Sequence, residues 1–207
     1  MKSRFKMGDE TKSDPHVRRK RNAAVTRDEI LSSARRLFAA HGYTGVGVRE
    51  IAAGAGVTAM LVNRYFGSKE ELFAEALSAA HAEPVILSRE NLESDDFPRA
   101  FAQALVGITE AGGNPLEGIS MMIRSASSER AAELAKSVIE KNPLKTLTSA
   151  LDGNLAPQRA ALMLSLVSGF QMLRQTIGIT ALSDAKPEDL VELLTPILRM
   201  LLAPEKS

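Results

Sequence analysis

The sequence predicts an all-α protein, in which an N-terminal three-helix helix-turn-helix domain precedes a C-terminal helical bundle, with about nine helices in all. Composition points this way, because tryptophan is absent and aromatic residues make up only 4% of the chain, whereas the helix formers alanine, leucine, glutamate and arginine are abundant. Apolar residues recur at helical spacing in most segments. Capping residues, prolines and glycines divide these segments from one another.

The first predicted helix begins at Thr26, which forms a capping box with Glu29, and is closed by the sequence His41-Gly42-Tyr43. One face of this helix is apolar. Its members are Ile30, Ala34, Leu37 and Phe38.

Residues 46–72 are the most informative stretch, because they predict two short helices joined by a tight turn and the start of a third. Gly54 and Gly56 flank the end of the first helix, and Thr58 offers a hydroxyl to cap the second. Gly67 ends that helix, and Ser68 with Glu71 forms the capping box of the next. A helix, a turn of three or four residues and a second helix is the arrangement that places the second helix in a DNA major groove.

Counting the helix that Ser68 opens, seven segments follow, each bounded by a capping residue, a proline or a glycine. Six are predicted as helices, and 143–151 is a turn or a helix. A polar stretch, 88–96, links the first to the second. The predicted segments are 68–82, 96–110, 115–126, 128–141, 143–151, 156–179 and 187–202.

The block from Thr26 to Leu77 resembles the DNA-binding domain of the TetR family of bacterial repressors, in an NRYFGSKE-type variant. The matching residues are LFAAHGY (37–43), VREIAAGAGVT (48–58) and RYFGSKEELF (64–73). The resemblance implies a basic arm (1–22), a DNA-binding domain (23–70) and a ligand-binding and dimerisation domain (71–207). It also implies these DNA-binding residues: Arg27, Arg49, Thr58, Ala59, Met60, Asn63, Arg64, Tyr65 and Lys69.

Two departures from the family pattern concern the operator. Val46 and Gly47 stand where the family commonly has a hydroxyl residue that contacts phosphate. Asn63 stands where a tyrosine commonly contacts phosphate, and an asparagine is either a base reader or a phosphate donor. We therefore expect an operator that differs from those of better-matching relatives.

The charge is uneven along the chain although its net value is only +1. Residues 1–80 carry 14 Lys and Arg against 9 Asp and Glu, whereas residues 81–207 carry 12 against 16. The positive end coincides with the helix-turn-helix, as phosphate binding requires. The basic run 18–21 lies directly before the first predicted helix. It is interpreted as a disordered arm that contacts DNA, the alternative being a plain solvated tail.

The last two predicted helices are apolar over more than one face, which is typical of a helix at the centre of a core or at an interface. In TetR-like proteins the two C-terminal helices pair with their two-fold mates in a four-helix dimer interface, so the resemblance implies a homodimer; ordinary core helices are the alternative. The expected interface residues are Leu162, Leu166, Phe170, Leu173, Leu190, Leu194, Ile197 and Leu201.

Between these regions the resemblance implies a pocket for a small-molecule inducer. Phe101, Leu105, Met121 and Met122 are expected to line it. Methionines at helical spacing are also common core residues, which is the alternative. The expected polar anchors of the ligand are Arg124, Gln171 and Arg174.

Catalysis finds no support in the sequence. It contains no cysteine, no histidine with a partner at metal-ligand spacing, and no nucleophile or phosphate-loop motif, so neither metal nor cofactor is expected. No apolar run reaches the length of a membrane span, and a cytoplasmic protein is expected. We therefore predict a repressor that a small apolar ligand releases from a palindromic double-stranded DNA operator. The alternative is a helical protein-interaction module without sequence-specific DNA binding.

Overall fold

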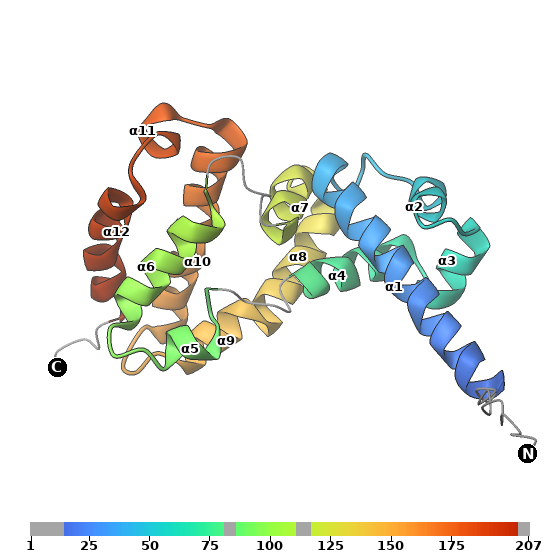
Figure 1. The fold of residues 1–207 in the computed structure, drawn as a ribbon, viewed down its shortest axis with the longest axis horizontal. Helices are drawn as coiled ribbons and strands as arrows, with labels where there is room; N and C mark the ends of the chain where they lie inside the picture. Colours follow the sequence, from blue (N-terminus) through green and yellow to red (C-terminus); the bar gives the residue numbers. More distant parts are fainter. Residues whose placement is uncertain (1–14, 81–85, 111–116, 203–207) are drawn as a thin grey trace, which may run out of the picture.

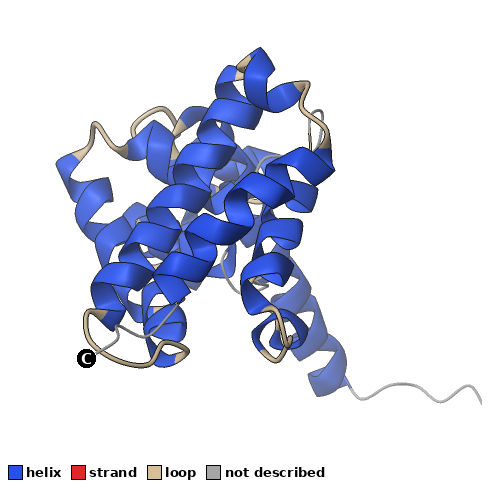
Figure 2. Cartoon of the chain, turned by 90° about the vertical axis from the view of Figure 1, so that its left-hand side faces the viewer, coloured by secondary structure: helices blue, strands red, loops and turns tan. Residues whose placement is uncertain are grey.

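The computed structural model describes residues 15–80, 86–110 and 117–202, and all regular structure within these ranges is helical (Figure 1, Figure 2). Helices α1 to α4 lie at one end of an elongated molecule, and α6, α10 and α12 lie at the other, with α7 and α8 between them (Figure 1). The elements are α1 (Pro15–His41), α2 (Val48–Gly54), α3 (Ala59–Phe66), α4 (Lys69–Ala80), α5 (Arg89–Leu92), α6 (Phe97–Ile108), α7 (Glu117–Ser125), α8 (Glu129–Lys141), α9 (Pro143–Ser149), α10 (Ala156–Gln171), the π-helical η1 (Met172–Ile177), α11 (Thr180–Ser183) and α12 (Pro187–Leu202).

The predicted helix-turn-helix is confirmed, together with the residues that bound it. The Thr58 hydroxyl accepts a hydrogen bond from the backbone N–H of Leu61 at 3.3 Å, which caps α3. Gly67 ends α3 with φ of 75°, a left-handed conformation that glycine adopts without strain. The Ser68 hydroxyl then accepts from the N–H of Glu71 at 3.1 Å at the start of α4. Short-range capping chemistry therefore positions α3.

The predicted start of the first helix is wrong. Helix α1 begins at Pro15, so residues 15–22 of the expected disordered arm continue the helix, and Thr26 lies inside it. Proline favours the first turn of a helix, and the arginines, lysine and alanines that follow are good helix formers, so the chain needs no cap at Thr26. The rest of the expected arm, 1–14, lies outside the described residues.

The described residues form two apolar cores. The first joins α1 to α4 with the inner faces of α7 and α8, and the second joins α6, α9, α10 and α12. Met122 of α7 packs against both cores. Leu72 and Phe73 are fully buried in the first core, so α4 packs with the helix-turn-helix, although the predicted domain boundary at residue 70 separates the two.

The structure adds two one-turn helices, α5 and α11, where the sequence indicated loops. The segment predicted as one helix from 156 to 179 instead changes from α10 into the π-helical η1 and ends at Gly178, where φ is 71°. Helix α12 continues through Pro196. None of the described helices combines the length and the apolar character that crossing a membrane requires.

Candidate nucleic-acid interface and ligand cavity

Helix α3 turns one polar face outward at the end of the molecule farthest from α12 (Figure 1). Asn63 and Arg64 are exposed on this helix, and the Met60 side chain is 80% exposed. Val62 and Phe66, on the opposite face, are buried in the first core. Thr58 is exposed at the cap, and Ala59 and Tyr65 are half-buried beside it. Three of the predicted DNA-binding residues, Met60, Asn63 and Arg64, therefore share the exposed face of α3.

The tight turn between α2 and α3 fixes the orientation of that surface. The Ser33 hydroxyl on α1 donates to the carbonyl of Ile51 at 3.0 Å, and both residues are buried. In the turn, the N–H of Val57 donates to the carbonyl of Ala52 at 2.9 Å, and Gly56 has φ of 66°. A buried hydrogen bond therefore holds α2 to α1, a backbone hydrogen bond fixes the turn, and apolar packing holds α3 in the same core.

The predicted basic residues divide into two groups. Arg49 on α2 and Arg64 on α3 are exposed, and the described residues offer neither of them an ion-pair partner. Arg27 pairs with the Glu75 carboxylate on α4, and its guanidinium carbon lies 4.7 Å from the centroid of the Phe66 ring. Arg27, which the resemblance implied as a DNA-binding residue, therefore makes its contacts inside the domain in this structure.

Lys69 is the first residue of α4, the helix that follows α3, and is half-buried. Its Nζ lies 4.4 Å from the centroid of the Tyr43 ring. Burial lowers the pKa of Lys69, and the Glu50 carboxylate opposes that shift. A cation at the first residue of a helix is unfavourable to the helix dipole, whereas an anion bound there would interact favourably with both.

Helix α7 joins the helix-turn-helix end to the second core. The backbone N–H of Tyr43 donates to the buried Ser125 hydroxyl at 2.9 Å. The Arg35 Nε of α1 pairs with the Glu117 carboxylate at 2.8 Å. Gly42, with φ of 72°, lies so close to α7 that a Cβ placed on it would be 2.4 Å from the Arg124 carbonyl oxygen. These contacts lie on the face of α7 that meets α1.

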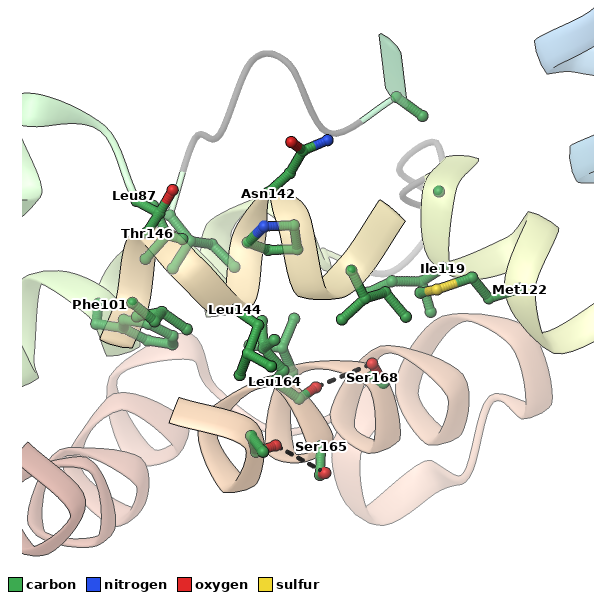
Figure 3. A pocket seen from close by; sticks show the side chains of 18 of the residues that line it. Leu87, Phe101, Ile119, Met122, Asn142, Leu144, Thr146, Leu164, Ser165 and Ser168 are labelled. Atoms are coloured by element: carbon green, nitrogen blue, oxygen red, sulfur yellow. Dashed lines mark hydrogen bonds between the residues drawn. The ribbon is translucent and has the colours of Figure 1, made fainter. Parts of the chain in front are cut away.

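The opposite face of α7 borders a cavity of about 670 Å³ between the two cores (Figure 3). Helix α10 closes the cavity on one side, and α7 and α9 lie across from it (Figure 3). The described lining is mostly aliphatic and carries no charged side chain; its polar members are Asn142, Thr146, Ser165 and Ser168. The apolar members include Ile86, Leu87, Phe101, Ile119, Met122, Leu144, Leu147 and Leu164.

Only some of the residues expected to line the ligand pocket border this cavity. Phe101 and Met122 line the cavity. Leu105 is instead fully buried in the second core and Met121 in the first, where each packs against other apolar side chains. Arg124 is exposed. The polar lining residues were missed, since a cavity depends on which helices leave space between them and gives no periodic signal in the sequence.

Two predicted polar anchors are also corrected. Gln171 and Arg174 are almost fully buried, and neither lines the cavity. The Arg174 guanidinium donates to the carbonyl of Val106 at 2.8 Å and to the Thr109 hydroxyl at 3.1 Å, so it fixes α6 to η1. Burial lowers the pKa of Arg174, and Glu110 opposes that shift.

The predicted dimer stripe is divided between an outer and an inner face. Leu162, Leu173 and Ile197 are exposed on α10, η1 and α12. The other expected interface residues face the inside of the chain. The sequence does not distinguish the two sides, because both helices are apolar on more than one face. Phe170, Leu190 and Leu194 are buried in the chain's own core, and Leu166 and Leu201 pack partly against it. Ile177 of η1 and Leu193 and Met200 of α12, which are not among the expected interface residues, are exposed as well.

Comparison with known proteins defines the class of this chain as a helix-turn-helix regulatory protein. The family described as "Bacterial regulatory proteins, tetR family" matches residues 30–76, and "Tetracyclin repressor-like, C-terminal domain" matches residues 95–202. The chain belongs to the TetR family. It is a family of regulatory proteins, not of enzymes.

Curated relatives match over short stretches of the chain. The HTH-type transcriptional repressor AcnR of Corynebacterium efficiens is 46% identical over 48 residues, which are 23% of this chain and 26% of AcnR. The HTH-type transcriptional repressor NicS of Pseudomonas putida is 38% identical over 64 residues, 31% of this chain and 30% of NicS. The matches thus span less than a third of these relatives.

Solved structures match over most of the chain. A TetR-family transcriptional regulator from Rhodococcus is 21% identical, with 87% of this chain and 100% of that chain covered and a TM-score of 0.66. The multidrug binding protein EbrR complexed with proflavin is 20% identical, with 83% and 99% covered and a TM-score of 0.54. At this identity the likeness supports the fold.

Proposed function

We propose that this protein is a transcriptional repressor that binds a palindromic operator as a homodimer and releases it when a small, largely apolar molecule enters the cavity beside α7. The observation that carries the DNA-binding part is the exposed polar face of α3, which projects Asn63 and Arg64 from a helix anchored by buried residues. Asn63 is assigned to a base edge, and Arg49, Arg64 and Lys69 to phosphate or bases.

The relatives support the same reading at this end of the chain. AcnR and NicS are both HTH-type transcriptional repressors, and the tetR-family model matches residues 30–76, which include the helix-turn-helix. For the ligand part, EbrR is a protein of similar fold whose complex with proflavin is known. The cavity of about 670 Å³ has the size and apolar lining of a small-molecule site.

The homodimer is supported by the exposed apolar side chains of α10, η1 and α12. The Leu193 side chain is 67% exposed and that of Met200 is 71% exposed. Clustered exposed apolar residues favour burial against a partner. A two-fold dimer presents two α3 helices, as the two half-sites of a palindrome require.

Release is proposed to pass through α7. Met122 and Ile119 of this helix border the cavity, while Ser125 and Arg124 contact the segment after α1. A ligand that shifts α7 would move the Tyr43 segment, whose ring contacts Lys69 and Phe73 of α4. Release requires that the ligand bind better to a conformation in which the two α3 helices no longer fit the operator.

Selection of duplexes from a random DNA pool tests the DNA-binding part. The expected result is an enriched inverted repeat whose half-site preference changes in Asn63→Ala. Recovery of no sequence preference by the folded wild-type protein would contradict the proposal and favour a protein-interaction module. Addition of apolar compounds to the selected complex then tests release as a loss of operator affinity.

A further inference from the structure

The two serines of α10 give the cavity a polar chemistry of one kind. Ser165 and Ser168 lie one turn apart on the helix that closes the cavity (Figure 3). The Ser165 hydroxyl donates to the carbonyl of Ala161 at 2.9 Å, and the Ser168 hydroxyl donates to the carbonyl of Leu164 at 2.9 Å. A serine hydroxyl has one hydrogen and two acceptor lone pairs, so each oxygen keeps acceptor capacity once its hydrogen is used.

The other polar groups of the lining contribute less to the space beside α10. The Asn142 amide nitrogen donates to the Ser78 hydroxyl at 3.2 Å, and this side chain points away from Leu164 (Figure 3). Thr146 lies on α9 and is exposed. Ser165 is exposed as well, whereas Ser168 is half-buried and therefore lies deeper.

The described part of the lining provides no counter-charge for a charged guest. A buried cation requires a carboxylate partner and a buried anion requires a cationic one, and the described lining offers neither. A hydrogen-bond donor on the guest, in contrast, would find the oxygen lone pairs of α10. A guest acceptor at the same place would meet oxygens whose hydrogens are already used.

We propose that the ligand of this cavity is an uncharged, predominantly hydrocarbon molecule with an N–H or O–H donor, and that the Ser168 hydroxyl, with Ser165 nearer the opening, accepts its hydrogen bond. This inference rests on the proposed function of the cavity and adds the chemical class of the ligand. It makes the two serines specificity-determining residues, whereas the sequence indicated methionines and arginines.

A matched pair of probes tests the inference without DNA. N-phenyl-1-naphthylamine is uncharged, fluoresces in apolar sites and has one N–H donor. Its N-methyl derivative has a methyl group in place of that hydrogen, so it is uncharged as well but has no donor. For wild-type protein we expect the N–H probe to bind about three- to tenfold more tightly, as one hydrogen bond provides. In Ser165→Ala/Ser168→Ala the difference should disappear, with N-methyl binding unchanged.

Ser149→Ala, at an exposed serine outside the cavity, is the control variant and should keep the difference. Thermal unfolding checks that the variants are folded. A preference that survives in the double variant would be steric and would overturn the inference, as would equal binding of both probes to wild-type protein. Displacement of the N–H probe by proflavin, a cationic dye, would contradict the uncharged class.

Two failures are distinguishable. If neither probe binds, the cavity does not take such ligands, and both this inference and the ligand part of the proposed function are contradicted. If the N–H probe binds and weakens operator binding but Ser165→Ala/Ser168→Ala changes nothing, the proposed function is supported and the serine assignment alone is wrong.

Discussion

We expect Asn63 and Lys69 to contribute to different parts of DNA recognition, although they lie close together in the sequence. Asn63 is exposed on the outer face of α3, whereas Lys69 is half-buried at the start of α4. We expect Asn63→Ala to change preference at one base position by roughly 1–3 kcal/mol. Lys69→Ala should weaken binding to all sequences alike and lower the salt slope by about one unit. Titrations of selected and random duplexes at several salt concentrations measure both effects.

Lys145→Ala serves as a control for the second effect, because Lys145 is an exposed cation on α9, in the other half of the molecule. It should leave the salt slope unchanged. Equal losses of affinity on selected and random DNA for Asn63→Ala would contradict its assignment to a base.

Gly42 and Gly56 have similar backbone conformations, with φ of 72° and 66°, but different surroundings. A Cβ on Gly42 would lie 2.4 Å from the backbone carbonyl oxygen of Arg124, whereas a Cβ on Gly56 would meet nothing within 4 Å. We expect Gly56→Ala to lower the free energy of unfolding by about 1 kcal/mol, the cost of the left-handed backbone alone. Gly42→Ala should lower it by about 2–4 kcal/mol, because α1 and α7 must separate.

Denaturant unfolding of the two glycine variants measures this difference directly. Similar decreases in stability in both would mean that α7 moves away from Gly42 at little cost. That result would be evidence against release of DNA through the contact between Gly42 and α7.

At the scale of helices, α7 carries the proposed communication between cavity and DNA. Ser125→Ala removes the acceptor of the Tyr43 N–H at a buried site, which should cost about 1–3 kcal/mol of stability. We also expect N-phenyl-1-naphthylamine to weaken operator binding less in this variant than in wild-type protein, since α7 is attached less tightly to the segment that it moves.

The matched control is Ser127→Ala, an exposed serine just beyond the end of α7. Operator titrations with and without the probe give the coupling for each protein. Unchanged coupling in a Ser125→Ala protein that is folded and binds the probe would remove this hydrogen bond from the mechanism.

The N-terminal extension of α1 separates two sources of DNA affinity. Removal of residues 1–14 leaves α1 intact, whereas removal of 1–22 also deletes its first two turns and the basic run 18–21. We expect the longer deletion to reduce operator affinity. The salt slope should fall as well, by about one unit for each phosphate group that the shortened protein no longer contacts. Equal affinity of the two truncated proteins at low ionic strength would assign these basic residues no role in DNA binding.

Helix ends were predictable where a local residue determines them and not elsewhere. Thr58, Gly67 and Ser68 fix the limits of α3 and α4 through caps and a left-handed turn, and each is readable from sequence. The start of α1 was misjudged because a capping box at Thr26 is optional inside a run of good helix formers. The π-helical turn from Met172 lies in a stretch whose apolar spacing fits an ordinary helix equally well.

At the scale of the molecule, the exposed face of α3 could be predicted from the sequence, but the cavity could not. Helix α3 is short and amphipathic, so its outer residues follow from its inner ones. The cavity depends on the spacing of α7, α9 and α10, which no single segment encodes, and Ser165 and Ser168 are ordinary helix residues until that space exists. Helices apolar on two faces left open which side of α10 and α12 meets a partner.

The exposed sides of α10 and α12 give a sharp test of assembly. Leu162→Glu and Leu193→Glu place charges on the outer face, where the Leu162 side chain is 57% exposed, so the folded monomer should tolerate them. In a dimer the same charges would be buried without partners, at a cost of several kcal/mol. We expect sedimentation to show a folded monomer with weakened operator binding, since one α3 helix makes half the contacts.

Leu194→Glu is unsuitable, because Leu194 belongs to the chain's own core. Val25→Glu, at an exposed apolar residue of α1, should leave the dimer intact. A wild-type protein that sediments as a monomer at micromolar concentration would contradict the homodimer, and with it the match between two α3 helices and a palindromic operator.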